Sequence, residues 1–514
     1  MFLDQVLFNF NLFSLCCEFL STEELLTTIS SCTKRWNTWI KTSKLLWKNK
    51  KIEINSFLHL NKYHELYSSV LNNLSSYYFD DIDMDDHEEL EKNWPTQNLE
   101  TRFFSSFLFP EVTFYKIYFT EEGFTEYANL FLQLKLPKLK ELELFYCGGD
   151  SLILIEGQET KQQEDFKINL PFEWNQLISL KLNCTPKYLK TTDLWKYLTS
   201  LKSTLKELTL EKIKLEKDII TITELSNLEK LTLTSFEMNT YFFSFYAKEE
   251  IGERHRYYSY DRKEDYPIHL FPGYKLKQLT HLSLTGFATC LLKSFSFREE
   301  EKEEMKYSES TINSCTNYLL SLDLDYDTHK KKVRADFSCL KDIYFMHLKD
   351  LCISRGSGYD MGFKYSSSNF INLKFLERLE ISDLKFKESK SSFPSLLETN
   401  CKTLMKLIIY NTNLDLKDLH LCSNLRRIDL LQIEITEHLF NSINTNLIHL
   451  KRLDFYMPFN GAGKFHLLSC LKERNIQCFF QLEKAHINEE EISYLKNQNC
   501  KIEVYDHGKR IDPI

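Results

Sequence analysis

Apolar residues recur along most of this chain in one short arrangement, L-x-x-L-x-L, which joins a spacing of three residues to a spacing of two. In the second half of the arrangement apolar residues alternate with others, which is typical of a strand that buries one face. The pattern therefore predicts one short strand for each copy, with its leucines on the buried side. Eleven copies begin at Leu139, Leu177, Leu205, Leu228, Leu279, Leu319, Leu348, Leu376, Leu404, Leu425 and Leu450.

The spacing of the copies indicates a repeat fold. Seven of the ten gaps between successive starts are 21 to 29 residues long. This is the period of leucine-rich repeats, whose strands stack in parallel with helices or loops on the outer side. We therefore predict the α/β class and a leucine-rich-repeat solenoid with a curved parallel sheet over residues 112–514. Amphipathic helices, which also carry L-x-x-L, are the alternative.

Other segments extend and interrupt the array. A weaker copy begins at Val112, and strand-like segments near Ile476 and Cys500 follow short helical patterns at 465–474 and 488–498. The three longer gaps hold polar or aromatic-polar sequence without the repeat. We predict insertions near residues 147–172, 241–275 and 287–317.

Residues 1–54 show a helical pattern instead. Ser21 and Glu24 form a capping box that begins a helix, and apolar residues continue at helical spacing. We expect a small helical module over 1–54, joined to the repeats by a linking segment over 55–111. The acidic stretch at 80–91 lacks the glycine and the spacing of a calcium-binding EF-hand, so we expect a charged loop there.

The stretch FLSTEELLTTISSCTKRWNTWIKTSKLLWK, residues 19–48, resembles the F-box of F-box proteins, in particular those whose F-box is followed by leucine-rich repeats. At the start of the module this chain has Phe8, Asn9 and Asn11, where the family has L-P-x-E-[IL]. The residues that carry the resemblance are Leu20, Leu25, Leu26, Cys32, Lys34, Arg35, Trp36, Leu46 and Trp47.

The resemblance implies a non-catalytic substrate receptor of an SCF-type cullin-RING ubiquitin ligase. The F-box would bind a Skp-family adaptor, and the repeats would hold the protein to be ubiquitinated. The alternative is a non-enzymatic repeat scaffold or regulator whose N-terminal helices only cap the apolar core of the array. The predicted adaptor-binding residues are Leu12, Phe13, Leu20, Leu25, Leu26, Ile29, Trp36 and Trp47.

The residues between the buried leucines would form the concave surface of the sheet. In the last four of the eleven copies, the third position is always basic, the fifth is mostly acidic and the seventh is mostly apolar or aromatic. Parallel strands place equivalent positions about 4.8 Å apart, so these residues would form rows that could seat a substrate peptide. A solvated face whose rows form weak ion pairs is the alternative. The predicted substrate-binding residues are Arg378, Lys406, Tyr410, Arg427, Arg452 and Tyr456.

Composition narrows the partners and the location. The net charge of −8 is spread over mixed charged residues, so we expect neither nucleic acid nor a membrane surface as a partner. No apolar run is long enough to span a bilayer, and the apolar start lacks the features of a signal peptide. The 14 cysteines are scattered without a C-x-x-C pair, which is typical of reduced proteins in the cytoplasm or nucleus.

No catalytic motif is complete. RGSGYDMG at 355–362 lacks the G-x-G-x-x-G spacing of a dinucleotide-binding loop. NGAGKF at 460–465 lacks the leading glycine and the hydroxyl residue of a phosphate-binding loop. We therefore expect no enzyme, no cofactor and no metal, and an unknown protein as the partner of the repeats.

Overall fold

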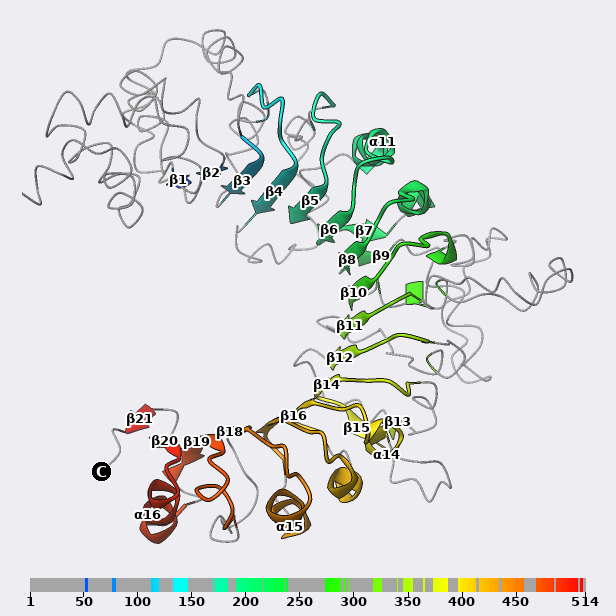
Figure 1. Cartoon of the computed structure of the whole chain (residues 1–514). Coiled ribbons are helices and arrows are strands. Elements are labelled where there is room, and N and C mark those ends of the chain that lie inside the picture. Colours follow the sequence, from blue (N-terminus) through cyan, green and yellow to red (C-terminus); the bar gives the residue numbers. More distant parts are fainter. Residues whose placement is uncertain are drawn as a thin grey trace, which may run out of the picture. The chain divides into compact units, whose positions relative to one another are not determined.

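The structure is a computed structural model, shown in Figure 1. Most of the predicted N-terminal module, the linking segment and the insertions lies outside the residues that it describes, as do all eight predicted adaptor-binding residues. The described residues are 51–53, 76–79, 112–119, 132, 134–146, 170, 172–183, 191–215, 217–235, 237–238, 273–286, 288, 291–292, 295, 318–325, 340, 345–354, 364–365, 373–386, 396–412, 416–433, 437–456, 468–484, 487–506 and 509–511.

The chain divides into two compact units, Met1–Leu228 and Glu229–Ile514. In the first unit, each strand from β1 to β6 pairs in parallel with the next. The strands are β1 (Lys51–Glu53), β2 (Ser76–Phe79), β3 (Phe114–Phe119), β4 (Glu141–Tyr146), β5 (Ser179–Asn183), β6 (Glu207–Glu211) and the short β7 (Lys214–Leu215). The helical elements are α11 (Thr191–Ser200) and the 3-10 helix η4 (Lys217–Glu224). Among the described residues, the parallel array therefore extends back to β1, ahead of the weak copy at Val112.

The second unit repeats this plan. Its strands pair in parallel in the order β8, β10, β11, β12, β14, β16, β17, β18, β19 and β20, and β21 pairs antiparallel with β20. In Figure 1 the helices α14, α15 and α16 all lie on the same side of these strands.

These are the elements of the second unit. The paired strands are β8 (Lys230–Ser235), β10 (His281–Gly286), β11 (Ser321–Asp325), β12 (Asp350–Ser354), β14 (Arg378–Ser382), β16 (Lys406–Tyr410), β17 (Arg427–Leu431), β18 (Arg452–Tyr456), β19 (Gln477–Glu483), β20 (Lys501–Asp506) and β21 (Lys509–Ile511). The short strands are β9 (Glu237–Met238), β13 (Lys364–Tyr365) and β15 (Lys385–Phe386). The helical elements are η6 (Gly273–Lys275), α14 (Leu396–Asn400), η11 (Lys417–Leu421), α15 (Glu437–Thr445) and α16 (Glu489–Asn497).

All eleven copies of L-x-x-L-x-L form a strand, and each strand begins at the third position of its copy. The fourth and sixth positions point into the core; Leu407 and Ile409 of β16, for example, are fully buried. Successive strands bring these residues opposite one another, so that Leu407 lies between Leu379 and Ile428. Burying one such side chain contributes about 1.5–3 kcal/mol, and the stacked apolar residues form a continuous core. The predicted parallel solenoid of leucine-rich repeats fits this architecture.

Backbone hydrogen bonds fix the register on both sides of the strands. Just before β16, the amides of Met405 and Lys406 both donate to the carbonyl of Glu377, at 2.8 and 3.0 Å. Just after β14 and β16, Asp383 and Asn411 have positive φ angles of 56° and 43°. Asp383 donates its amide to the carbonyl of Tyr410 at 2.9 Å. Asp and Asn tolerate this left-handed conformation, so the turn recurs without glycine.

Of the two short helical patterns near the C-terminus, one is confirmed and one is wrong. The pattern at 488–498 forms α16, which Asn488 caps by accepting a hydrogen bond from the Glu491 amide at 2.8 Å. The described part of the pattern at 465–474 forms turns instead. Here Arg474 donates to the carbonyl of Ile443 in α15 at 2.6 Å, so contacts with the preceding repeat favour a different backbone path.

Candidate functional site on the open face of the second unit

The side chains at the third, fifth and seventh template positions lie opposite the buried leucines, on a surface that we call the open face. In the second unit, equivalent positions of neighbouring strands pair directly, as the sequence predicts. From β14 to β18 they form a basic row (Arg378, Lys406, Arg427, Arg452), an acidic row (Glu380, Ile408, Asp429, Asp454) and an apolar row (Ser382, Tyr410, Leu431, Tyr456). All six predicted substrate-binding residues therefore share one surface.

The arginines of the basic row pair with carboxylates on their own strands. Arg427 Nε lies 2.9 Å from Asp429 Oδ1, and Arg452 Nε lies 2.6 Å from Asp454 Oδ2. Arg427 Nη2 also lies 3.5 Å from Asp454 Oδ2, which links β17 to β18. Arg378 pairs with its own carboxylate two residues along in the same way, at 2.7 Å. The ion pairs of the alternative interpretation are thus present for each arginine.

The two members of these pairs differ in exposure. The side chain of Asp454 is 1% exposed, whereas those of Arg427 and Arg452 are 35% and 45% exposed. Burial raises the pKa of Asp454, and its hydrogen bond to Arg452 acts in the opposite direction. The hydrogen bond to Asp429 raises the pKa of Arg427. The carboxylates therefore hold the guanidinium groups in place, while part of each arginine side chain still faces solvent.

Lys406 differs from the three arginines. Its strand carries Ile408 at the fifth position, where both neighbouring strands carry a carboxylate. Among the described residues, none forms an ion pair with Lys406. Burial lowers the pKa of Lys406, and the charges of Arg378 and Arg427 lower it further. Lys406 therefore lies between two arginines without an ion pair of its own among the described residues.

The apolar row continues into an aromatic contact at the C-terminal end. The rings of Tyr456 and Phe479 lie 5.5 Å apart, and Lys501 Nζ lies 5.1 Å from the centre of the Phe479 ring. Burial raises the pKa of Tyr456, and the nearby Asp454 adds to this effect. The repeat pattern predicted Tyr456 as a site residue, but it did not predict Phe479 or Lys501. The strand-like segments near 476 and 500 held the signal that could have found them.

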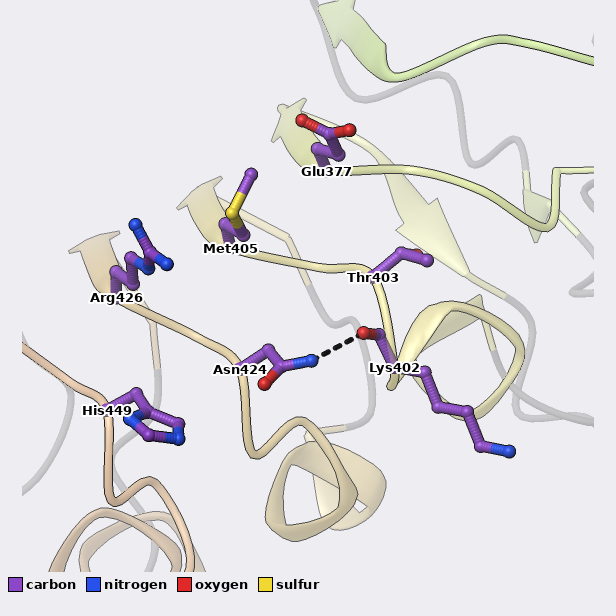
Figure 2. A pocket seen from close by; sticks show the side chains of 7 residues that line it. All are labelled: Glu377, Lys402, Thr403, Met405, Asn424, Arg426 and His449. Atoms are coloured by element: carbon purple, nitrogen blue, oxygen red, sulfur yellow. Dashed lines mark hydrogen bonds between the residues drawn. The ribbon is translucent and has the colours of Figure 1, made fainter.

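Figure 2 shows a pocket of about 340 Å³ next to the basic row, at the edge where β14, β16 and β17 begin. Asn424 Nδ2 donates to the Lys402 carbonyl at 2.6 Å, while the Lys402 side chain points away from the other residues drawn. Most of the residues that line this pocket are polar or charged, whereas typical cofactor pockets are lined mainly by apolar side chains. The lining residues are Glu377, Lys402, Thr403, Met405, Asn424, Arg426 and His449.

The rows at the third, fifth and seventh template positions do not reveal this pocket, because several of its lining residues occupy the second position. Glu377, Met405 and Arg426 occupy that position and directly precede the first residues of their strands. Glu377 is already paired with Lys349 at 2.7 Å. The exposed Arg426 therefore extends the positive charge of the basic row towards the edge of the sheet.

The open face of the first unit has a different charge pattern. There Glu143 lies between Lys116 and Lys181 in one row, at 3.5 and 2.6 Å from their amino groups. Asn183 donates to Glu211 at 2.6 Å in the next row. Opposite charges alternate along this row, so its side chains form ion pairs between neighbouring strands.

Within the described ranges, no group of three or more His, Cys, Asp or Glu side chains could hold a metal ion. No described helix combines the length and the apolar character needed to cross a bilayer.

The chain was compared with protein-family models, curated proteins and solved structures. No family model and no curated protein matches the chain. Among solved structures, the chain is similar to an internalin from Listeria monocytogenes, with 15% sequence identity and a TM-score of 0.38. That match covers 78% of this chain and 88% of the internalin. A similarity this low does not bear on function.

Proposed function

We propose that this chain is a non-catalytic recognition protein, and that the open face of its second unit binds a segment of a partner protein. The observation that supports the proposal is the pairing of β14, β16, β17 and β18, which brings the six predicted residues onto one surface. Partly exposed arginines are suited to binding carboxylate or phosphate groups. Tyr410 and Tyr456 supply the aromatic area that anchors many protein interfaces.

A capture experiment tests this proposal. The tagged chain is expressed in its own cells, and co-purifying proteins are quantified for wild type and for the double variant Tyr410→Ala/Tyr456→Ala. We expect the variant to lose a defined set of proteins, because it removes the anchors without changing charge. Phe145→Ala, on the open face of the first unit, is the control and should keep them. Unchanged capture by the double variant would remove the proposal.

We further propose a more specific role, as the substrate-recognition subunit of an SCF-type cullin-RING ubiquitin ligase in the cytoplasm or nucleus. The support is the resemblance of residues 19–48 to the F-box, followed by leucine-rich repeats. In this role the N-terminal module binds a Skp-family adaptor. The bound partner would then be the protein that the ligase modifies.

Adaptor binding separates this role from that of a repeat scaffold. The purified chain and a Skp-family adaptor should form a stable heterodimer in size-exclusion chromatography. The triple variant Leu25→Ala/Leu26→Ala/Trp36→Ala should abolish it, because apolar helix faces drive such contacts. A well-folded chain that does not bind the adaptor would favour the scaffold.

A further inference from the structure

Strand β16 breaks the pattern of its neighbours on the open face. In β14 and β17, the arginine at the third position pairs with a carboxylate two residues along the same strand, at 2.7 and 2.9 Å. In β16 the equivalent residues are Lys406 and Ile408. The sheet therefore places three cations side by side, and the central one lacks a partner among the described carboxylates.

The donors of this cluster come from three adjacent strands about 4.8 Å apart. The described contacts of Arg378 use one terminal nitrogen, which donates to Glu380 at 2.7 Å. Arg427 donates through Nε and one terminal nitrogen, at 2.9 and 3.5 Å. A guanidinium has five N–H groups and an ammonium has three, so each residue keeps donors for a ligand. Three acceptor oxygens on one group, as in a phosphate monoester, suit donors that lie side by side on three strands.

An apolar surface adjoins the cations. Along β16 the open face runs from Lys406 through Ile408 to Tyr410, and Leu431 of β17 lies beside Tyr410. These three apolar side chains are all partly exposed. A free inorganic anion would leave them uncovered, whereas a peptide could place an apolar side chain on them.

We propose that β16 is the centre of the partner site, where Arg378, Lys406 and Arg427 hold a phosphate group of the partner peptide. Ile408 and Tyr410 contact an apolar side chain next to that phosphate. This inference rests on the proposed recognition function and names the chemistry of the bound segment.

Peptide libraries test the inference. The immobilised full-length chain is offered three libraries with the same degenerate flanks and a fixed central phosphoserine, glutamate or serine. We expect phosphoserine peptides to be captured about tenfold more than serine peptides, a difference of about 1.4 kcal/mol, with glutamate peptides between them. Apolar residues should be enriched within a few positions of the phosphoserine.

Ile408→Asp is the decisive variant, because it removes no cation. It gives Lys406 the carboxylate that both neighbouring strands already have, and it should reduce phosphoserine capture to the serine level. Lys406→Gln is the second variant and should weaken capture in the same way. Lys472→Glu, an exposed site in the turn before β19, is the charge control and should leave capture unchanged. Unchanged thermal unfolding shows that each variant is folded.

The outcomes separate this inference from the proposed function. Equal capture of the three libraries, or phosphoserine capture that survives Ile408→Asp, overturns the phosphate site. If the proteins captured from cells are nevertheless lost in the double tyrosine variant, the recognition function stands and only the phosphate is wrong. Capture of no library also overturns the inference, and the tyrosine and adaptor experiments still decide the function.

Discussion

In the first unit the carboxylate of Glu143 lies between two lysines of neighbouring strands, whereas in the second unit Lys406 lies between two arginines. The two units share parallel strands and a leucine core. They differ in the direction in which charges pair. Opposite charges that alternate along a row pair across strands. The arginines of the basic row in the second unit pair mainly along their own strands, and Arg427 also reaches Asp454 on the next strand.

On the open face of the second unit, whether a basic residue is paired therefore depends on the residue at the fifth template position of the same strand. Where that position carries Glu380, Asp429 or Asp454, the basic residue of the same strand is compensated. Where it carries Ile408, the basic residue Lys406 forms no ion pair with a described carboxylate. One apolar residue in a charged row is therefore enough to turn a surface of ion pairs into a candidate binding site.

The largest expected effect tests whether the apolar cores of the two units are packed equally well. Leu144→Ala and Leu407→Ala each remove a fully buried side chain. Each should lower the free energy of unfolding by about 3 kcal/mol, because a cavity is left in a packed core. Urea unfolding measures both. Losses that differ by more than about 1.5 kcal/mol would show that the interiors are not equivalent.

The next effect compares the two kinds of ion pair. Asp454→Ala should cost about 2 kcal/mol, because a buried carboxylate that binds two arginines is lost. This loss of unfolding free energy is smaller than for a fully buried ion pair, because both arginine side chains are more than one-third exposed. Glu143→Ala should cost at most about 1 kcal/mol. A larger loss for Glu143→Ala in urea unfolding would reverse the comparison.

A smaller effect concerns stability at β16 itself. Ile408→Asp should raise the free energy of unfolding by about 0.5 kcal/mol relative to Ile408→Asn, because only the carboxylate can pair with Lys406. The two variants have nearly the same size, so their difference in urea unfolding isolates the charge. Equal stability would mean that Lys406 is already compensated.

The smallest expected effect is a pH dependence. Because the pKa of Lys406 is lowered from 10.5, its charge is lost at a lower pH than that of an ordinary lysine. Arg378 and Glu380 of β14 and Arg427 and Asp429 of β17 face it; the arginines lower the pKa and the carboxylates raise it.

Phosphopeptide capture should therefore weaken by about twofold as the pH rises towards 10.5, since the peptide phosphate keeps its full charge over this range. Lys406→Arg, which stays charged, should bind with little change over the same range. A parallel decline in both proteins would assign the pH dependence to another group.

The repeat pattern predicted the strands well because it reflects a physical alternation. The start of each strand, the buried leucines and the rows of Arg378, Lys406 and Arg427 all follow from the period of two. The helical pattern at 465–474 failed because local spacing does not include the bond between Arg474 and the preceding repeat. β2 was missed because Ser76–Phe79 carries no copy of the template.

The sequence by itself determined where the strand of each of the eleven template copies begins, which side chains share the open face and which of these strands lacks an acidic residue, since these depend on a fixed period along the chain. Only the tertiary structure decided that Asp454 is buried, that Arg427 joins two strands, and that residues before the strands line a pocket. Those features depend on how completely neighbouring repeats enclose each side chain. That enclosure is set by packing between strands and not by the spacing of residues within one strand.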